Sequence, residues 1–477
     1  MTSRACALLL GLTVTLAACT SLPTTPVTAR TAWAAGGLVR QFVLPAGEAM
    51  RVELGEANRL LMAVSAAHAE APAFQFRIQH QHPTQGEARF RESGARLAQE
   101  PGALDWEPVR RVQAAAETET FWVNIGDSTE AGDRKRTAKR RLTTAHANFY
   151  VDAEGAEGIT DDQLKRLGEA FESRIYGTVT GTFGAEPKTD PSGESRVYVV
   201  LSPAVDNFGK DKGLMGYFWS RDLLSPAATG PRAHTNQKKV IFLTSRLFEQ
   251  PAQTVFGTLA HEFTHLCVFN QKVLVPNRAT PEETWLDEGW AMLAMDLCGY
   301  GLRGGNEAIA RDIKRFEEAP AEYSLTDWAG NPNGFSYGLS YLFARYLYDR
   351  FGAEVVKDAL AAPATGVGAV QGGLVKREAS FQDVYSDWTV ANAVSGLKLT
   401  DDRRFSYASD VNLRGTYGGL TLGGVQARPV ADFQKGLPGT LRPWSTTYYD
   451  LKAPAKRTWA FEFRSGSALF GGAIVLP

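Results

Sequence analysis

Residues 255–270 of this 477-residue chain read VFGTLAHEFTHLCVFN. His261 and His265 are four residues apart, so on an α-helix both imidazoles project from one face. This spacing lets both rings reach a single tetrahedral Zn²⁺, while the neighbouring Glu262 can reach a water molecule on the ion without being a ligand. Apolar residues surround the motif on nearly every side of the helix, which predicts burial, and buried polar side chains need partners. The stretch therefore predicts a metal-binding helix rather than a solvated one.

A second helix downstream offers a third ligand. Residues 280–295 read TPEETWLDEGWAMLAM, and Thr280, Pro281 and Glu283 form a helix-start pattern. A catalytic zinc needs a third protein ligand and one open position for water. Glu288 lies among apolar residues, where a carboxylate is rare unless it is paired or coordinates a metal. Glu288 is therefore the predicted third ligand, with the adjacent Asp287 as the alternative.

The composition narrows the kinds of partner. The chain has 51 Lys and Arg against 52 Asp and Glu, a net charge of −1, which gives no general attraction to phosphate backbones. This argues against nucleic acid as the main partner. Four Cys are too few for a disulfide scaffold in a chain of this length. Cys267 and Cys298 are expected to be free thiols on buried helices, and a disulfide remains the alternative.

The N-terminus has the pattern of an export signal that ends in a lipid-accepting cysteine. Arg4 precedes an apolar run too short to span a membrane, and LAAC at 16–19 resembles the bacterial lipobox. We therefore expect residues 1–18 to be a lipoprotein signal peptide and Cys19 to carry acyl chains such as palmitate. By the habit of such lipoproteins, the absence of Asp after Cys19 favours the outer membrane of a Gram-negative cell. The alternative is an ordinary secretory signal with an incidental Cys.

The remaining chain divides into segments that differ in composition and in predicted secondary structure. Residues 19–36 suit a tether, and residues 37–126 contain short alternating segments, such as Phe74, Phe76 and Ile78, that predict a β-sandwich domain. Residues 127–144 are polar with a basic end and predict a linker. Residues 145–396 combine strands at 196–201 and 240–244, an edge strand at 213–219 and long helices, and 397–477 predict a second β-rich domain. The expected fold class is α+β.

The motifs together resemble a known group of enzymes. HEFTH at 261–265 followed by WLDEGWA at 285–291 resembles the gluzincins, in which a Glu on a downstream helix completes a His-His-Glu site. GYFWSRDL at 216–223 and TWLDEGWAMLAMDLCGYG at 284–301 are similar to the hyicolysin-type metallopeptidases of bacteria. The resemblance covers about 145–396. It implies a zincin-like core, with a small sheet and a helical subdomain, that holds one catalytic Zn²⁺ on His261, His265 and Glu288.

Two positions depart from the family pattern. Asp287 stands where the family commonly has Asn, and Met292 stands where thermolysin-like enzymes carry an Asp. Met292 cannot accept a hydrogen bond from a ligand imidazole as that Asp would. Asp287 and Asp296 are therefore both open as partners of the His ligands.

The resemblance also implies a mechanism. The metal polarises the scissile carbonyl and lowers the pKa of its water, and Glu262 acts as general base. Tyr337 resembles a Tyr of related gluzincin aminopeptidases and is the candidate donor to the oxyanion, with a role in the core or at the rim as the alternative. His146 and His234 are weaker candidates.

The predicted edge strand has a use in substrate binding. Zincins commonly bind a peptide antiparallel to an edge strand, so Gly213, Gly216 and Tyr217 are candidate substrate-binding residues. A strand simply packed in a sheet is the alternative. The expected function is a zinc-dependent endopeptidase acting on peptides or proteins and anchored to a membrane through Cys19. The alternatives are an aminopeptidase and a catalytically silent surface lipoprotein used for binding.

Overall fold

The computed structural model describes residues 39–44, 49–66, 115–124, 132–210, 214–224, 234–278, 280–332, 336–430, 441–464 and 469–476. Several sequence predictions lie outside these ranges: the signal peptide, Cys19, the tether, the alternating segment at 74–78 and Gly213. Among the described residues, no helix is both long and apolar enough to cross a membrane.

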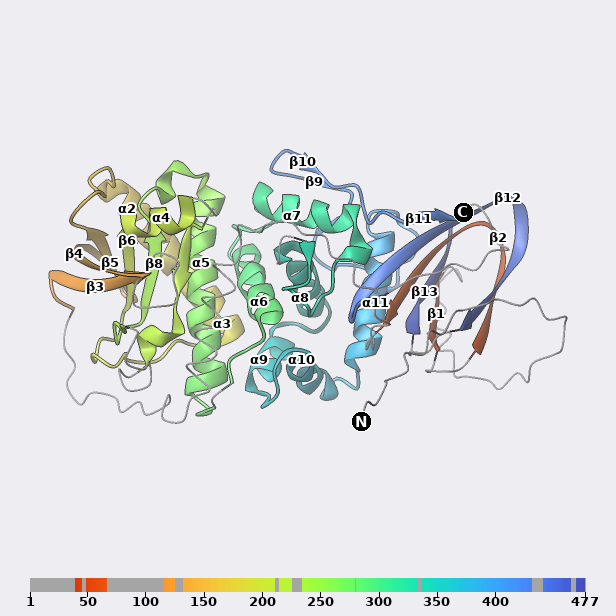
Figure 1. Ribbon diagram of the computed structural model, residues 1–477, viewed down its shortest axis with the longest axis horizontal. Helices are drawn as coiled ribbons and strands as arrows, with labels where there is room; N and C mark the ends of the chain where they lie inside the picture. Colours follow the sequence, from red (N-terminus) through yellow and green to blue (C-terminus); the bar gives the residue numbers. More distant parts are fainter. Residues whose placement is uncertain are drawn as a thin grey trace, which may run out of the picture.

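The first layer is a six-stranded sheet in the order β3-β4-β5-β6-β8-β7 (Figure 1). Its middle strands β5, β6 and β8 are parallel and buried along their length, which explains their continuous apolar runs. β3, β4 and β7 run antiparallel to their neighbours, and β7 confirms the predicted edge strand. The strands are β3 (Thr118–Asn124), β4 (Asp133–Thr143), β5 (Ala147–Asp152), β6 (Val197–Ser202), β7 (Gly216–Phe218) and β8 (Val240–Thr244).

Helices on this sheet include the one that carries the metal motif. α5 packs against β7 and β8 on one side and against α6 on the other (Figure 1). Thr160 and Gln163 form a capping box at the start of α2. The helices are α2 (Asp161–Ala170), continued by a π-helical turn (Phe171–Ile175) into α3 (Tyr176–Phe183), then α4 (Pro203–Lys210) and α5 (Ala252–Phe269).

A helical layer follows α5. α6 packs against both α5 and α8, and α7 covers α8. α6 begins at Thr284, with Glu283 at the N-cap position and no side-chain cap, so the helix start expected with Thr280 as N-cap is wrong by three residues. The Glu282 side chain is instead turned to Lys272 and to the backbone N–H of Gly366. The helices are α6 (Thr284–Leu297), α7 (Glu307–Glu318), α8 (Tyr337–Phe351), α9 (Ala353–Ala361), α10 (Gly366–Val375) and α11 (Phe381–Val394).

The two ends of the described chain meet in a five-stranded sheet in the order β1-β13-β2-β12-β11. β2 lies between β13 and β12 and pairs antiparallel with both. α11 packs against this sheet (Figure 1). One apolar core includes residues of the first sheet, the helices and this sheet. The strands are β1 (Val39–Leu44), β2 (Ala49–Ala66), β11 (Arg428–Val430), β12 (Ser445–Arg464) and β13 (Leu469–Leu476); a small hairpin, β9 (Thr416–Tyr417) and β10 (Leu420–Thr421), precedes them.

This topology corrects three domain boundaries. The prediction of separate β-rich domains at 37–126 and 397–477 is wrong for the described strands, because those of the two ends form one sheet. β3 also belongs to the first sheet rather than to an N-terminal sandwich. The linker predicted at 127–144 is wrong from Asp133 onward, where β4 lies. Four of the six basic residues of β4 are exposed, and ion pairs join Arg136 to Asp152 at 2.7 Å and Arg141 to Asp161.

Hydrogen bonds connect residues just before β12 of the terminal sheet to a loop of the helical layer. This loop, residues 322–331, is called the fastened loop. Arg442 donates to the Asp327 carboxylate at 2.6 Å and to the Glu322 carbonyl at 2.7 Å. The backbone N–H of Leu325 donates to the Trp444 carbonyl at 2.9 Å. The conformation of the fastened loop therefore depends on residues near the C-terminus.

Candidate metal centre

Helix α5 and helix α6 bring three potential ligands together. His261 and His265 are one turn apart on α5, and Glu288 lies in the second turn of α6. The Glu288 Oε2 atom is 3.1 Å from His261 Nε2 and 3.6 Å from His265 Nε2. Gly289 lets α6 approach α8 closely, because a Cβ there would lie 3.0 Å from the Ser340 carbonyl oxygen. The helix pair thus sets the separation of the three donor atoms.

The donor set fits a metal ion. One ligand atom from each of the three residues lies within 4.8 Å of the others, and among the described residues this is the one such cluster of His, Cys, Asp and Glu. All three residues are buried, with Glu288 1% exposed. Two imidazoles and a carboxylate around one point suit zinc with an open fourth position. The structure therefore assembles the three residues that the sequence singled out.

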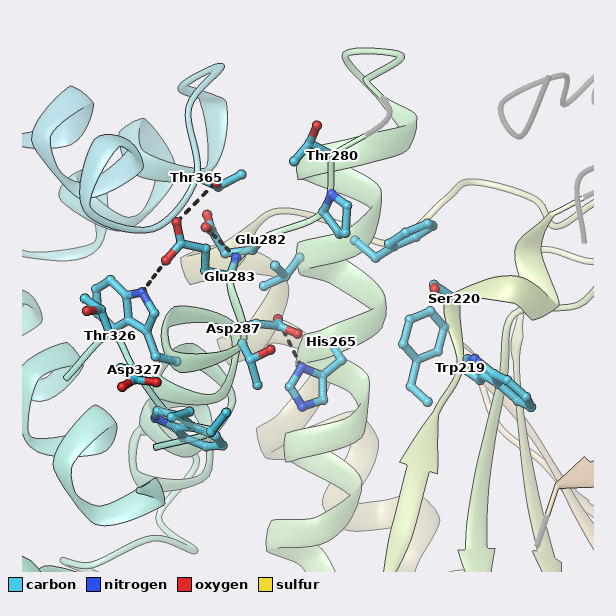
Figure 2. A pocket seen from close by; sticks show the side chains of 18 residues that line it. Trp219, Ser220, His265, Thr280, Glu282, Glu283, Asp287, Thr326, Asp327 and Thr365 are labelled. Atoms are coloured by element: carbon cyan, nitrogen blue, oxygen red, sulfur yellow. Dashed lines mark hydrogen bonds and ion pairs between the residues drawn. The ribbon is translucent and has the colours of Figure 1, made fainter. Parts of the chain in front are cut away.

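Asp287 contacts the other side of His265. Its Oδ1 lies 3.1 Å from His265 Nδ1, the ring nitrogen that faces away from Glu288 (Figure 2). A carboxylate in this position can fix the tautomer and orientation of a ligand imidazole. This geometry favours Glu288 over Asp287 as the third donor of the cluster. Asp296, the other candidate partner of the ligands, is wrong: its carboxylate is bound by Arg303 at 2.9 Å and Arg345 at 3.3 Å.

Glu262 points from α5 toward the edge strand. Its Oε2 accepts a hydrogen bond of 2.8 Å from the backbone N–H of Phe218 in β7, and the residue is 6% exposed. In the antiparallel pairing of β7 with β8, the backbone groups of Tyr217 point toward β8. Those of Phe218 point the opposite way, so the Phe218 N–H faces away from β8. The contact holds the carboxylate at the boundary between the cluster and the edge of the sheet.

Tyr337 is the first residue of α8, and its ring is beside the cluster. The ring centroids of Tyr337 and His261 are 6.4 Å apart, and Trp328 packs on Tyr337 edge to face at 5.0 Å. By contrast, Tyr341 and Tyr346 of the same helix are fully buried in the core. Of these three tyrosines, Tyr337 is therefore the one whose ring lies beside the cluster.

His146 and His234 have partners of their own. His146 Nδ1 lies 2.6 Å from Glu172 Oε2, and the ring stacks on Tyr176. His234 stacks on Trp122, with its Nδ1 3.1 Å from Asp133 Oδ2. These contacts explain both residues as structural, so their candidacy as oxyanion donors is wrong. Cys267 and Cys298 are free and buried, as expected.

The edge-strand residues Gly216 and Tyr217, predicted to bind substrate, pack within the protein. The Tyr217 side chain is 7% exposed, and its hydroxyl accepts a 2.8 Å hydrogen bond from the Asn124 backbone N–H. Its expected role in substrate contact is therefore wrong, because alternate strand residues face opposite sides of the sheet. A Cβ at Gly216 would lie 2.6 Å from Leu243 and 3.1 Å from Thr258, so this glycine permits packing of the strand within the protein. Gly213 lies outside the described residues.

A cavity of about 430 Å³ adjoins the cluster (the side cavity; Figure 2). His265 and Asp287 form part of its wall, together with Phe218, Trp219 and Ser220 at the end of β7. The other walls come from the end of α5, the start of α6 and residues 326–329. No local motif in the sequence marks the segment 326–329. Phe218, Trp219 and Ser220 lie within the GYFWSRDL motif, but the motif alone does not assign them to a cavity.

Comparison with known proteins gives three similarities. A family model described as Peptidase M30 matches residues 112–422. The chain is 25% identical over 340 residues to the neutral metalloprotease ShpI of Staphylococcus hyicus, which covers 68% of this chain and 70% of that protein. Among solved structures, it is similar to the M1 zinc metallopeptidase of Deinococcus radiodurans, with a TM-score of 0.31 and 13% identity over 55% of this chain and 58% of that one.

Proposed function

Because the chain belongs to the peptidase M30 family, we propose that it is a zinc-dependent endopeptidase whose centre is the His261, His265 and Glu288 cluster. The resemblance to hyicolysin-type metallopeptidases is thereby confirmed, and the chain is a metallopeptidase, a hydrolase of peptide bonds. The observation that carries the finer proposal is the convergence of three buried donor atoms beside Glu262 at an edge strand.

The proposed ligands are His261 Nε2, His265 Nε2 and Glu288 Oε2. When bound there, zinc supplies Lewis acidity that polarises a carbonyl and lowers the pKa of a water molecule. Asp287 holds His265 in the tautomer that leaves Nε2 free to coordinate, through the 3.1 Å contact to Nδ1. The protein thus contributes both the donors and their orientation.

Glu262 is the proposed general base. It takes the proton of the attacking water and passes it to the leaving amine. The Phe218 N–H keeps its carboxylate at the strand edge, where a peptide antiparallel to β7 would lie. The Tyr337 hydroxyl is the proposed donor to the oxyanion of the tetrahedral intermediate. An intact Glu262 beside the donor cluster supports catalysis over a silent binding role.

Metal analysis combined with a cleavage assay tests this proposal. The purified protein is expected to contain about one zinc per chain and to cut casein at internal bonds, with activity lost on chelation and restored by zinc. Mass spectrometry of the fragments separates internal cleavage from stepwise removal of terminal residues. Bound zinc without any cleavage would favour the binding role, and a well-folded protein that takes up no zinc would overturn the site assignment.

We also propose that the protein is exported and anchored to the cell envelope through a lipid on Cys19. The support is the LAAC sequence at 16–19 after a short apolar run. Replacing Cys19 with Ala should move the protein from the membrane fraction to the soluble fraction while peptidase activity per molecule is retained. A variant that stays in the membrane fraction would argue against lipid attachment at this residue.

A further inference from the structure

Among the residues that the structure describes, the lining of the side cavity contains four acidic residues but no Lys or Arg. The four are Glu282, Glu283, Asp287 and Asp327. The wall includes His265 of the donor cluster, so the cavity opens beside the reaction centre. A pocket of about 430 Å³ accepts a single large side chain easily. Its charge indicates which kind of side chain it suits.

Two of these carboxylates are neutralised from behind the wall. Glu282 pairs with the buried Lys272 at 3.2 Å, and Asp327 pairs with Arg442 at 2.6 Å. Burial raises the pKa of the Glu282 carboxyl and lowers the pKa of the Lys272 ammonium, because each loses hydration. These two acids therefore add little net charge to the cavity.

Glu283 has neutral partners instead. It is exposed, and its oxygens accept from neutral donors, the Trp285 indole N–H at 2.8 Å and the Thr365 hydroxyl at 3.5 Å (Figure 2). Among the described residues it forms no ion pair. A carboxylate has about four acceptor sites, so Glu283 retains capacity for a further donor. It is the carboxylate in the cavity best suited to receive a cation from outside the protein.

The remaining wall is aromatic. Phe218, Phe269 and Trp328 line the same cavity. Aromatic faces attract cations, and they also cover the methylene stem of a long side chain. A Lys or Arg side chain combines an apolar stem with a terminal charge, which matches this wall and the carboxylate of Glu283. A neutral aliphatic side chain would satisfy only the aromatic part.

The direction of β7 places this cavity relative to the scissile bond. A peptide antiparallel to β7 has its N-terminal part beside the end of the strand. Phe218, Trp219 and Ser220 at that end line the cavity, whereas Gly216 at the start does not. Glu262, bonded to the Phe218 N–H, marks where the bond is attacked. The cavity therefore serves the residue that precedes the scissile bond.

We propose that the side cavity is a specificity site for a Lys or Arg side chain immediately before the scissile bond, with Glu283 as its counter-ion. The assignment rests on the proposed endopeptidase function. It adds a preference that the overall charge of −1 does not suggest, because the selection is made by a few groups close to the substrate.

Quenched peptides with acetylated N-termini, identical except at the residue before the bond, test the proposal. For the wild type we expect kcat/KM to be about tenfold higher with Arg than with the isosteric, neutral citrulline, about the contribution of one partly exposed charge-assisted hydrogen bond. Glu283→Gln should bring this ratio close to one, and Glu283→Lys should shift the preference to Glu. Glu318→Gln, which removes an exposed carboxylate on α7 outside the cavity wall, is the matched control and should keep the wild-type ratio.

The outcomes separate the two proposals. Equal cleavage of the Arg and citrulline peptides by an active wild type would overturn the specificity site and leave the endopeptidase standing. The same peptides with free N-termini are assayed in parallel. Cleavage only of these would remove the specificity site and the endopeptidase proposal together, since the recognised cation would then be the substrate terminus. A wild type that cuts neither these peptides nor casein would remove the endopeptidase proposal itself. An inverted preference in Glu283→Lys would support the site and could not result from misfolding.

Discussion

Replacing Glu262 with Gln should lower kcat for peptide hydrolysis by about 10²–10⁴-fold, the range expected for loss of a positioned general base. Gln has nearly the same shape and can still accept the 2.8 Å hydrogen bond from the Phe218 N–H. It cannot take a proton from water. Zinc content and thermal stability should therefore match the wild type while turnover is lost. Steady-state rates with a quenched peptide, measured beside metal content, would show this.

Glu249→Gln is the matched control for this experiment. Glu249 is an exposed carboxylate shortly before α5, so its replacement changes the net charge equally without reaching the site. It should keep wild-type turnover. Retention of more than about a tenth of the wild-type rate in Glu262→Gln would mean that another group moves the proton. A loss of zinc from this variant would show that Glu262 contributes to the ion site.

Glu288→Gln should weaken zinc binding by more than about 100-fold, beyond the 10–100-fold typical of losing an outer partner of a ligand. Glu288 is 1% exposed and faces both imidazoles, so the variant loses the charged donor of the cluster. Without metal, the substitution removes a buried charge and should not reduce stability. Competition with a chelating dye would give the affinities. Zinc should raise the melting temperature of the wild type and not that of the variant.

Asp287→Asn provides the comparison on the adjacent residue. An amide oxygen can still accept from His265 Nδ1, so zinc affinity should stay within about tenfold of the wild type. If Asp287→Asn lost zinc and Glu288→Gln kept it, the third ligand would be Asp287. The pair of variants therefore decides between the two adjacent carboxylates left open by the sequence.

The metal-binding residues could be predicted from the sequence because the patterns that identify them lie within short segments of the chain. Helical spacing alone aligns His261 with His265, and apolar surroundings alone make Glu288 conspicuous. The direction of each side chain on the three-residue strand β7 was harder to predict from the sequence. Tyr217 was expected to meet substrate, but strand alternation turns it to the opposite face, and its neighbours Phe218 and Ser220 line the cavity instead.

The ends of the chain could not be assigned from local patterns. Pairing of β2 with β12 aligns Leu60 with Leu451, residues far apart in sequence, and no spacing rule connects them. Basic residues of β4 suggested a linker, but most of them are exposed and Arg136 pairs with Asp152, while Ala138 of the same strand is buried. Tertiary partners, absent from local sequence, decide such cases.

The terminal sheet combines strands from distant parts of the sequence, and this affects the order in which parts of the protein can fold. The fastened loop, which carries one wall of the side cavity, is held by Arg442 and Trp444, which come long after the donor helices in the sequence. β2 can pair with β12 and β13 only after those strands have been synthesised. Contacts between segments so far apart in the sequence form slowly. A growing chain can therefore form its donor helices long before the fastened loop, and with it one wall of the side cavity, is held in place.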